Sequence, residues 1–423
     1  MSEKSLNNNE YGVDNPIPIF IHEKPHRKVL TGLKLLTESY KTVGSHYKIR
    51  PSTDKQQDHV STHQTQLPHD LLMHHILAKM PIKSLLQSKL VSKQWYSTVS
   101  SNEFANLHLK TCFSSYYPMI SHVECLFIQA EKGFYLFHIQ EEDVVIHYSL
   151  VKLEPNFGYN PQNKLYLVGS CNGLVCLSDS VTGYFYLWNP VIYHWMRFSD
   201  FFLGSGYKCH ASWGFGYVSS ANDYKVVKIE QKYDTNEVIV LLFSLQTKVW
   251  KQIFDHGLED GVSLTKTSPG VLVNDTLFWI IDHPIKRHIV VGFDLVLEKF
   301  EEIPGLTPRS SVSFRDHFLC VMGGCLALYS SNLYKKGCVS ILKPSGHVDS
   351  ISVCSKSDSW SCTSLVGFTR TGKSLVVSKN WELGVIDLDS SPREYLTLIT
   401  FDKTRDNPCI LSFFPSLISL MKV

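Results

Sequence analysis

One segment of the chain has the spacing of a phosphate-binding loop. Gly367, Gly372, Lys373 and Ser374 satisfy the pattern GxxxxGK[ST], in which backbone N–H groups and the lysine hold nucleotide phosphates. Such a loop must follow a buried strand and open a helix, whose N-terminal amides complete the phosphate site. The residues that follow here, LVVSKNWELGVIDL, are apolar and β-branched, which is typical of a strand. We therefore predict a hairpin with its turn at Thr371-Gly372, and no nucleotide site.

The other residue types that could do chemistry form no recognisable cluster. The chain has 11 cysteines, and the nearest pairs, Cys171/Cys176 and Cys320/Cys325, are spaced C-x4-C within apolar, strand-like sequence. Zinc sites favour tighter cysteine knuckles combined with a second pair. An odd number of cysteines instead indicates reduced thiols that pack as small hydrophobes. The 19 histidines are scattered, and neither HExxH nor GxSxG occurs. We therefore expect no catalytic residue, no metal site and no cofactor.

Residues 67–109 carry three short helical patterns that are punctuated by two prolines. Pro68 suits the first helical position, because the N–H that it lacks would have no helical partner there. The first helix should end at Met80, since a proline at position 81 disfavours helical geometry in the residue before it. Pro81 then opens a second helix, and Ser92 caps a third. Leu72, Ile76 and Met80 recur at i, i+4 and i+8 of the first helix, Leu85 and Leu86 should face inward on the second, and Val91, Trp95 and Val99 share one side of the third. The three helices are too short to enclose a core, which is typical of a docking module.

The same stretch resembles the F-box of plant F-box proteins along nearly its whole length. The pattern LPxDLL…IL…(M/L)P-x-KSLL…VSKxWxxx(V/I)S is matched at Leu67, Pro68, Asp70, Leu71, Ile76, Leu77, Pro81, Lys83, Ser84, Leu85, Leu86, Val91, Ser92, Lys93, Trp95, Phe104, His108 and Leu109. Between Leu67 and Ile76 the spacing is one residue longer than in the family, because of the pair His74-His75. An additional residue rotates the face of an α-helix, so we expect looser, although not abolished, docking. Gln87 stands where the family often has arginine.

Length and composition favour an intracellular protein with one large domain and one small one. The chain has 423 residues, of which 43% are hydrophobic, enough for a large core. Its 41 basic and 39 acidic residues leave a net charge of +2, so neither nucleic acid nor a membrane surface is indicated as a partner. No apolar stretch approaches the roughly 20 residues of a membrane span, and no signal-peptide-like run lies near residue 1. We expect residues 1–66 to be a disordered leader, and the protein to be located in the cytoplasm, the nucleus or both.

From residue 112 to residue 423, short β-rich runs alternate with turn residues. A hydrophobic strand, a polar turn and an aromatic-bearing strand recur four times, anchored by Trp195, Trp250, Phe300 and Tyr395. The separations of these aromatics are 55, 50 and 95 residues. The last interval is nearly twice the others, and a degenerate copy around Val339–Leu342, ending near Trp360, would fill it. A period near ~50 residues with four strands per unit is typical of a kelch-like β-propeller.

The predicted fold is therefore multidomain. A small all-α unit of three helices at residues 67–111 is followed by an all-β, kelch-like β-propeller at residues 112–423, whose number of blades stays open. Each blade must stack on its neighbours, because it cannot bury both faces alone. Gly323-Gly324, which follows a strand and precedes CLALY, is similar to the kelch double glycine.

Residues 160–400 resemble the F-box-associated domain of the same plant family. The matching segments follow the family order, namely GSCNGLVCL, YLWNPVIYHW, GFGYVSSANDYKVVKI, LLFSLQTKVWKQI, GVLVNDTLFWI, VVGFDLVLEKFEEIP, LCVMGGCLALY and SWSCTSLVGF. The clearest marks are Asn189-Pro190 and Phe215-Gly216-Tyr217, while Phe278 stands where the family usually has histidine. The two resemblances support each other, because they occur in the family's order.

Together the resemblances imply the substrate-recognition subunit of an SCF-type (Skp–cullin–F-box) ubiquitin ligase. The F-box would bind a Skp-type adaptor, and through it cullin, while the β domain would bind a target protein, which the sequence leaves unidentified. The subunit itself would be non-catalytic, since it acts by raising the effective concentration of the target. The residues implied in adaptor binding are Leu67, Pro68, Leu71, Ile76, Leu77, Pro81, Leu85, Val91 and Trp95. Trp95 and Val99 are equally consistent with a role in holding the helices together.

Two further questions stay open at this point. A non-degradative propeller scaffold with a non-functional F-box is an alternative, and so is a propeller enzyme, because fold alone does not determine function. The turn aromatics Tyr116, Tyr117, Phe201, Phe202 and Tyr207 are candidate target contacts, since aromatic residues dominate interface hot spots. They are also consistent with closing the blades or filling the space beside the helices.

Overall fold

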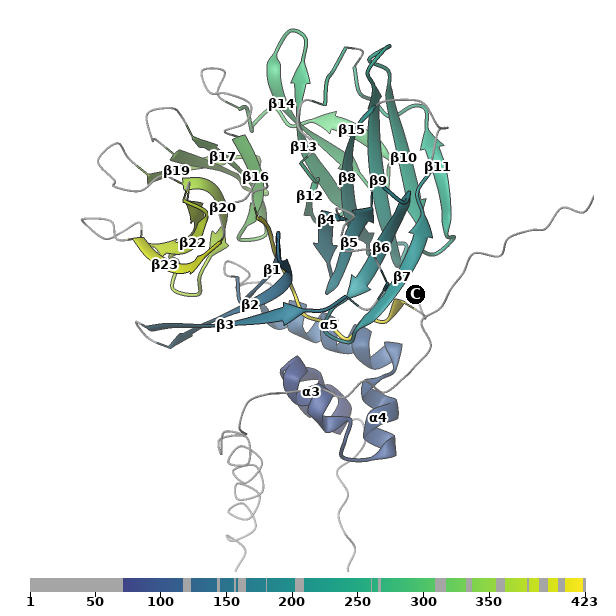
Figure 1. The fold of residues 1–423 in the computed structure, drawn as a ribbon, viewed down its shortest axis with the longest axis vertical. Helices are drawn as coiled ribbons and strands as arrows, with labels where there is room; N and C mark the ends of the chain where they lie inside the picture. Colours follow the sequence, from purple (N-terminus) through teal and green to yellow (C-terminus); the bar gives the residue numbers. More distant parts are fainter. Residues whose placement is uncertain are drawn as a thin grey trace, which may run out of the picture. The chain divides into compact units, whose positions relative to one another are not determined.

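Five helical segments begin the described part of the chain. The computed structural model describes residues 71–116, 123–142, 145–155, 157–158, 165–179, 181–201, 209–259, 261–264, 268–308, 317–331, 337–354, 362–378, 380–387, 395–401 and 408–420. The segments are a π-helix, η2 (Leu72–Ile76), a 3₁₀ helix, η3 (Leu77–Lys79), and the α-helices α3 (Ile82–Ser88), α4 (Lys93–Val99) and α5 (Asn102–Tyr116) (Figure 1). The expected leader at residues 1–66 lies outside the described residues.

Local side-chain chemistry starts three of these helices. Pro81 precedes α3 with an extended ψ of 144°. The Ser92 hydroxyl accepts the Trp95 N–H at 3.1 Å, and the Ser101 hydroxyl accepts the Phe104 N–H at 3.1 Å, which caps α4 and α5. The predicted starts at Pro81 and Ser92 are thus confirmed. The prediction of a regular first helix is wrong within its described part, because a π turn and a 3₁₀ turn replace it. Helix α5 was not predicted, and it runs past residue 111.

Six four-stranded antiparallel sheets form the rest of the described chain, and we number them as blades in chain order. The first blade contains β1 (Cys125–Ala130), β2 (Gly133–Glu142), β3 (Val145–Leu153) and the last strand, β24 (Cys409–Ser412). The second contains β4 (Leu165–Cys171), β5 (Leu174–Asp179), β6 (Tyr184–Asn189) and β7 (His194–Ser199), and the third contains β8 (Cys209–Val218), β9 (Asp223–Lys232), β10 (Val238–Ser244) and β11 (Val249–Ile253). The fourth contains β12 (Val271–Val273), β13 (Thr276–His283), β14 (Arg287–Asp294) and β15 (Lys299–Glu302). The fifth contains β16 (His317–Met322), β17 (Cys325–Ser331), β18 (Gly337–Leu342) and β19 (Val348–Cys354), and the sixth contains β20 (Cys362–Phe368), β21 (Ser374–Ser378), β22 (Glu382–Ile386) and β23 (Tyr395–Thr400).

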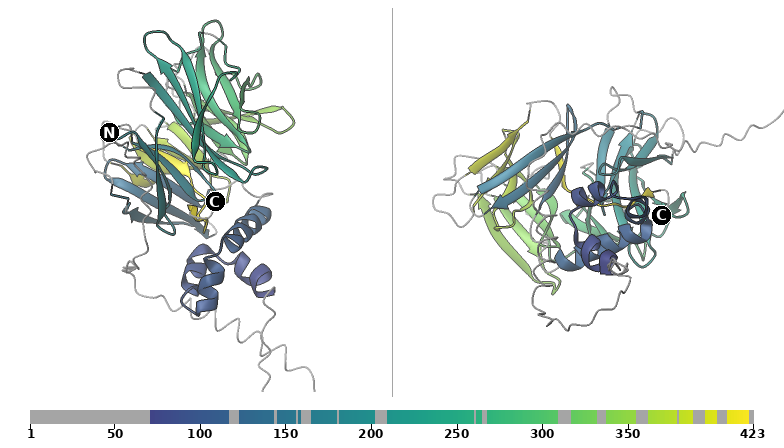
Figure 2. Two further views of the ribbon diagram at one scale, coloured as in Figure 1. Left: turned by 90° about the vertical axis from the view of Figure 1, so that its right-hand side faces the viewer. Right: turned by 90° about the horizontal axis from the view of Figure 1, so that it is seen from below.

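The blades close into a ring. The innermost strands are β24, β4, β8, β12, β16 and β20, and each contacts the next in that order, with β20 contacting β24 again (Figures 1 and 2). Apolar side chains fill the spaces between blades. One such cluster joins the third and fourth blades through residues that include Val227, Val240, Trp279 and Val291. The predicted β-propeller is therefore confirmed, and its number of blades is six.

The aromatic repeat found in the sequence is the hairpin between the third and fourth strands of a blade. Trp195 pairs with Trp188 across this hairpin, Trp250 with Phe243 and Phe300 with Phe293. Tyr395 pairs with Ile386 in the same position of the sixth blade. Blade five supplies the predicted degenerate copy, with Val339–Leu342 in β18, but its outer strand ends at Cys354. Trp360 lies outside the described residues.

The segment with phosphate-loop spacing is a hairpin, as predicted. Strand β20 ends at Phe368 and β21 begins at Ser374. In the turn, the Gly372 N–H donates to the Thr369 carbonyl at 3.0 Å, and Gly372 has a φ of +85°, which glycine adopts without strain. No helix follows, so the amides that a phosphate site needs are absent from this turn.

The end of the chain closes the ring. Strand β24 lies inside the first blade and pairs with β1, from Leu126 opposite Ser412 to Gln129 opposite Cys409. Residues 413–420 then continue along the second blade, where Leu417 and Ile418 are buried. Gly173, with a φ of +79°, allows this approach, because a Cβ there would clash with the Ser416 side chain.

Asn189 anchors this terminal segment, and its side chain is completely buried. Its amide Nδ2 donates to the carbonyls of Ser416 at 3.0 Å and Ile418 at 2.9 Å. Its Oδ1 accepts the Val191 N–H at 3.0 Å and so shapes the turn that follows β6. One side chain therefore couples a hairpin turn of the second blade to the end of the chain.

The helices and the propeller share one apolar cluster within residues 69–423, which form one unit of the chain. Leu77, Leu85 and Phe104 of the helices belong to the same buried cluster as Phe215 of the third blade and Leu417 of the terminal segment. The expectation that the helices cannot enclose a core alone agrees with this packing.

Replacement of Asn189 by alanine tests the anchor. The variant leaves two buried carbonyls and one N–H without this partner, so we expect the free energy of unfolding to fall by about 1–3 kcal/mol. Chemical denaturation of the full chain, followed by tryptophan fluorescence, measures the change. Asn380→Ala is the matched control, because Asn380 is exposed and bonds only through its backbone N–H in the described structure. Equal stability of the two variants would contradict the assigned role.

Candidate functional site

The nine side chains implied in partner binding divide by exposure. Leu71, Pro81 and Val91 are exposed, with 46% exposure for Leu71 and 66% for Val91. Ile76 and Trp95 are half-buried. Leu77 and Leu85 are buried, at 1% and 0%. Leu67 and Pro68 lie outside the described residues.

The two buried leucines hold the helices together. Leu77 and Leu85 pack in one cluster with Val99 and Phe104, all of them enclosed. An enclosed side chain has no surface to offer a second protein. Leu77 and Leu85 therefore shape the helical unit from within, and Val99 takes the same role. Trp95 packs against this cluster with its buried part.

Apolar surface that the sequence pattern did not single out lies at the turn between α3 and α4 and on α4 itself. Leu90 is 88% exposed and Tyr96 is 60% exposed. The Lys89 amine lies 5.9 Å from the centre of the Tyr96 ring, and partial burial lowers the pKa of Lys89. Val91, which was expected to share one side of the third helix with Trp95 and Val99, precedes the cap residue Ser92 and so lies outside that helix. The position of Ser92 was the signal for this in the sequence.

The additional residue of the first helix is absorbed by a π turn. The Leu77 N–H points toward two carbonyls. One is that of Leu72, five residues back, as in a π turn, and the other is that of Met73. A π turn accommodates one extra residue while the flanking turns keep their phase. His74 and His75, which create the longer spacing, are exposed within this turn, while Leu77 is buried immediately after it. The expected rotation of the helix face, and the looser docking that it implies, stay predictions.

His108 fixes the end of this first segment. Its side chain is 2% exposed, and its Nε2–H donates to the Met80 carbonyl at 2.9 Å. Met80 precedes Pro81, so its carbonyl lies where the helical hydrogen-bond pattern stops. Burial lowers the pKa of His108, which favours the neutral imidazole that this bond uses.

The cysteines and histidines do not converge. Among the described residues, no group of three or more His, Cys, Asp or Glu side chains is placed to hold a metal ion. The thiols of Cys125 and Cys176 are buried, and this burial raises the pKa of both, so they stay protonated. Eight cysteines with described side chains, Cys125 and Cys176 among them, are free thiols.

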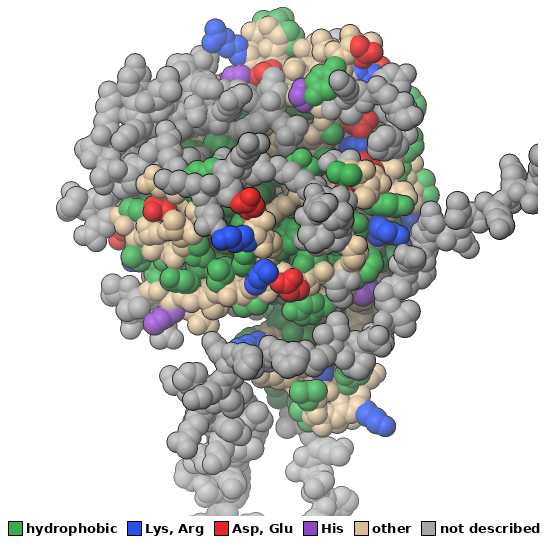
Figure 3. All heavy atoms as spheres, viewed as in Figure 1, with side chains coloured by type: hydrophobic (Ala, Val, Ile, Leu, Met, Phe, Trp, Pro, Cys, Tyr) green, Lys and Arg blue, Asp and Glu red, His purple; other side chains and the backbone are tan. Residues whose placement is uncertain are grey.

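Charged side chains are mixed rather than separated on the face drawn in Figure 3, where Lys or Arg and Asp or Glu side chains alternate.

A buried group of three charged side chains lies at the end of β7. The Lys228 amine is 2.6 Å from the Asp200 carboxylate and 2.6 Å from the Glu230 carboxylate. Burial raises the pKa of Asp200 despite this pairing.

Of the turn aromatics, Tyr116 ends α5, and the Phe201 carbonyl accepts from Lys228 at 3.4 Å. Tyr117, Phe202 and Tyr207 lie outside the described residues.

Deletion of His75 tests the π turn. The turn already loops out one residue, so we expect the deletion to convert it into a regular α-helical turn and to leave the melting temperature of the full chain within a few degrees of the wild type. Deletion of Gln87 is the matched control, because Gln87 is exposed in a regular helix where no bulge absorbs the change. We expect that control to unfold the helical unit, as seen by limited proteolysis. Equal damage from both deletions would contradict the interpretation.

Comparisons with known proteins agree with this architecture. A model of the F-box domain matches residues 65–107, and a model of the F-box associated beta propeller domain matches residues 115–342, more than half of the chain. In the described structure, no helix is long and apolar enough to cross a membrane.

The relatives are plant proteins. An F-box/kelch-repeat protein of Arabidopsis thaliana is 27% identical over 65% of this chain and 72% of its own length. A putative F-box protein of the same plant is 28% identical over 56% of this chain and half of its own length. F-box protein CPR1 of Arabidopsis thaliana is 25% identical over 62% of this chain and 66% of its own length.

Among solved structures, the SapL1 lectin in complex with alpha methyl fucoside matches with a TM-score of 0.38 and 10% identity, over 67% of this chain and 98% of the lectin. This similarity is too low to transfer a binding function. The match of the family model over more than half of the chain shows that this protein belongs to the F-box associated beta propeller domain family.

Proposed function

We propose that this protein is the substrate-recognition subunit of an SCF-type ubiquitin ligase. Its F-box would bind a Skp-type adaptor, and through it cullin, while its propeller would bind the target protein. The observation that carries the proposal is the division of the helical unit into two kinds of apolar side chain. Leu77, Leu85 and Val99 are enclosed, whereas Leu71, Leu90 and Val91 stay exposed in the same small unit.

Exposed apolar side chains of this kind indicate an interaction surface. A contact rich in apolar side chains gains its free energy from removing them from water, at roughly 25 cal/mol per Å². The proposed adaptor surface comprises Leu71, Ile76, Pro81, Leu90, Val91, Tyr96 and the exposed part of Trp95, together with Leu67 and Pro68.

The mechanism that we propose is positional. The ligase would transfer ubiquitin with groups of other subunits, while this chain holds a target near them and so raises its effective concentration. A closed ring of six blades suits that task, since its turns are held on a rigid core. The proposal places the protein in the cytoplasm or the nucleus, and its free thiols are consistent with a reducing compartment.

Charge substitution on the exposed surface tests the adaptor contact. We expect the double variant Leu90→Asp, Val91→Asp to reduce binding of a plant Skp-type adaptor by more than tenfold, because two carboxylates would have to be desolvated in the contact. The dissociation constant is measured by titrating purified full chain with the adaptor. Leu396→Asp is the control, since Leu396 is 54% exposed on β23 of the sixth blade, away from the helices. Unchanged adaptor affinity of the double variant would rule out this surface.

A buried position separates stability from binding. Leu85→Ala removes an enclosed side chain, so we expect a loss of about 2–5 kcal/mol in the unfolding free energy of the helical unit. Because Leu85 makes no contact with the adaptor, the affinity for the adaptor should fall only by the fraction of molecules in which the helical unit is unfolded. Hydrogen exchange of the helices, measured beside adaptor binding, distinguishes this outcome from direct loss of a contact.

A further inference from the structure

The helical unit is much more basic than the rest of the chain. Residues 71–116 contain five lysines and one glutamate, whereas acidic side chains slightly outnumber basic ones in residues 117–423. The near-neutral balance of the whole chain therefore conceals a positively charged helical unit. Like charges repel one another, so this clustering of lysines does not stabilise the unit itself.

Three of these lysines make no polar contact through their amines. Lys79, Lys83 and Lys93 are exposed, and neither an ion pair nor a hydrogen bond of their amines occurs among the described residues. Lys83 and Lys93 lie in the first turns of α3 and α4, which contain no acidic residue. A cation is unfavourable in a first turn, because the helix dipole already places partial positive charge there. These lysines therefore do not stabilise the helices that carry them.

Lys93 lies directly beside the exposed apolar side chains of the unit. It follows Val91 by two residues and precedes Tyr96 by three on α4, so Lys93 and Tyr96 are neighbours on one side of the helix. The Lys89 amine lies 5.9 Å from the centre of the same Tyr96 ring. A partner that covers Val91 and Tyr96 must therefore approach these cations. Removing a cation from water without a counter-charge is strongly unfavourable, so the partner must supply anionic groups.

Two kinds of anionic partner would fit a cationic unit, namely a nucleic acid and an acidic protein surface. Residues 71–116 contain no arginine, the residue best suited to bidentate contacts with phosphate. Leu90 is 88% exposed and Val91 is 66% exposed, and a phosphate backbone gains nothing from covering them. A protein contact does gain free energy from removing both side chains from water. The combination favours an acidic protein surface.

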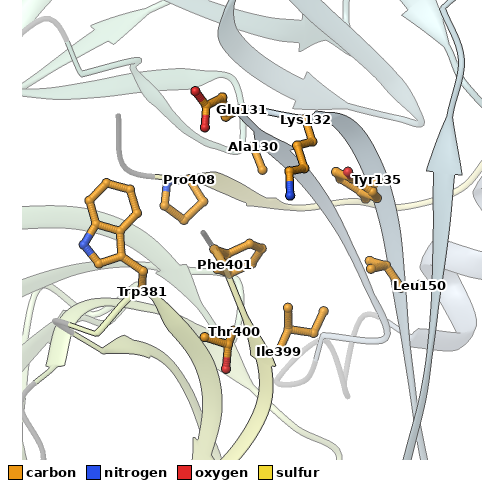
Figure 4. Close-up of a pocket in the computed structure, with 10 residues that line it drawn as sticks. All are labelled: Ala130, Glu131, Lys132, Tyr135, Leu150, Trp381, Ile399, Thr400, Phe401 and Pro408. Atoms are coloured by element: carbon orange, nitrogen blue, oxygen red, sulfur yellow. The ribbon is translucent and has the colours of Figure 1, made fainter. Parts of the chain in front are cut away.

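A cavity of about 290 Å³ between the sixth and first blades gives no comparable indication of its partner (Figure 4). Its walls include Trp381 and Phe401 from the sixth blade, and Tyr135 and Leu150 from the first. Lys132 lies beside it but already interacts with another group, so its charge is not free to select a ligand. Free cations next to apolar surface are thus a feature of the helical unit and not of this cavity.

We propose that the helical unit docks onto an acidic surface of the adaptor, with carboxylates placed opposite Lys93 and the cations near it. The inference rests on the proposed function, and it names the chemistry of the adaptor surface that covers Leu90, Val91 and Tyr96. Attraction between opposite charges reaches about 10 Å at moderate salt concentration. The cations would therefore mainly speed the encounter with the adaptor, while the apolar contact would hold the complex together.

Association kinetics of a plant Skp-type adaptor with the full chain test the proposal. We expect the association rate constant of the wild type to fall about tenfold between about 50 mM and about 500 mM sodium chloride, because salt screens the attraction. Lys93→Glu should lower this rate constant about fivefold at the lower salt concentration and leave it nearly unchanged at the higher one. The substitution also places an anion in the first turn of α4, where it is favourable, so the melting temperature should not fall. A loss of charge attraction is thereby separated from unfolding.

Lys248→Glu is the matched control, because it makes the same change of charge outside the helical unit. Lys248 is exposed at the turn between β10 and β11. Glu298 takes the same place in the turn between β14 and β15, and the two residues have φ values of +57° and +59°. The turn therefore tolerates a glutamate, and the control should associate with the adaptor as rapidly as the wild type.

Each outcome of this experiment decides one of the two proposals. An association rate constant that does not depend on salt, or that falls equally in Lys93→Glu and in the control, overturns the acidic surface and leaves the ligase function standing. Absence of adaptor binding at both salt concentrations refutes the ligase function, and the acidic surface with it. A DNA duplex is titrated in parallel, and duplex binding that is lost in Lys93→Glu would overturn the proposal in favour of a nucleic acid.

Discussion

The pairing of β24 with β1 is the contact on which the rest of the propeller depends. Six blades bury their faces only against one another, so a ring with an open joint would expose the facing sides of the first and sixth blades. The chain closes this joint by placing its last strand inside its first blade, with four residue pairs from Leu126 to Gln129. The segment beyond β24 then returns to the second blade, where the buried amide of Asn189 holds two of its carbonyls. Residues 409–412 thus close the ring, and the residues that directly follow them anchor the terminal segment to the second blade.

The helical unit shows how a short module tolerates an added residue. In a regular helix the extra histidine would displace every following side chain by about 100° around the axis. In this chain a π turn contains the histidine pair at residues 72–76, and Leu77 and Leu85 are both buried in one cluster. The unit also borrows part of its core, because Phe215 and Leu417 of the propeller side complete the cluster. A module of this size gains stability from that shared core and can leave other apolar side chains exposed.

The blades repeat one plan, and their departures from it are informative. The paired aromatics of the outer hairpins recur in the second, third and fourth blades, where they serve packing. The turn between the second and third strands carries a residue of positive φ in several blades, namely Gly133, Gly183, Asn236, Arg287 and Trp381, so this feature of the plan tolerates different side chains. The buried group of Lys228, Asp200 and Glu230 also departs from the plan, but it is an internal contact, because the one lysine pairs with both carboxylates within the third blade and its neighbour.

The sequence by itself determined much of this protein. Hairpin spacing predicted the blades, because a strand, a tight turn and a paired aromatic are local features that lie within about ten residues. Pro81 and Ser92 predicted helix starts for the same reason. The phosphate-loop pattern was correctly interpreted as a hairpin, since the residues after Ser374 are β-branched.

Only the tertiary structure decided which apolar residues of the helical unit are enclosed. Leu85 and Val91 look alike in the sequence, yet Leu85 is buried and Val91 is 66% exposed, because burial depends on neighbours from α5 and the propeller. The number of blades, the partner of β24 and the cavity beside Trp381 were likewise decided there. Each joins residues that lie hundreds of positions apart, and no local pattern records such a contact.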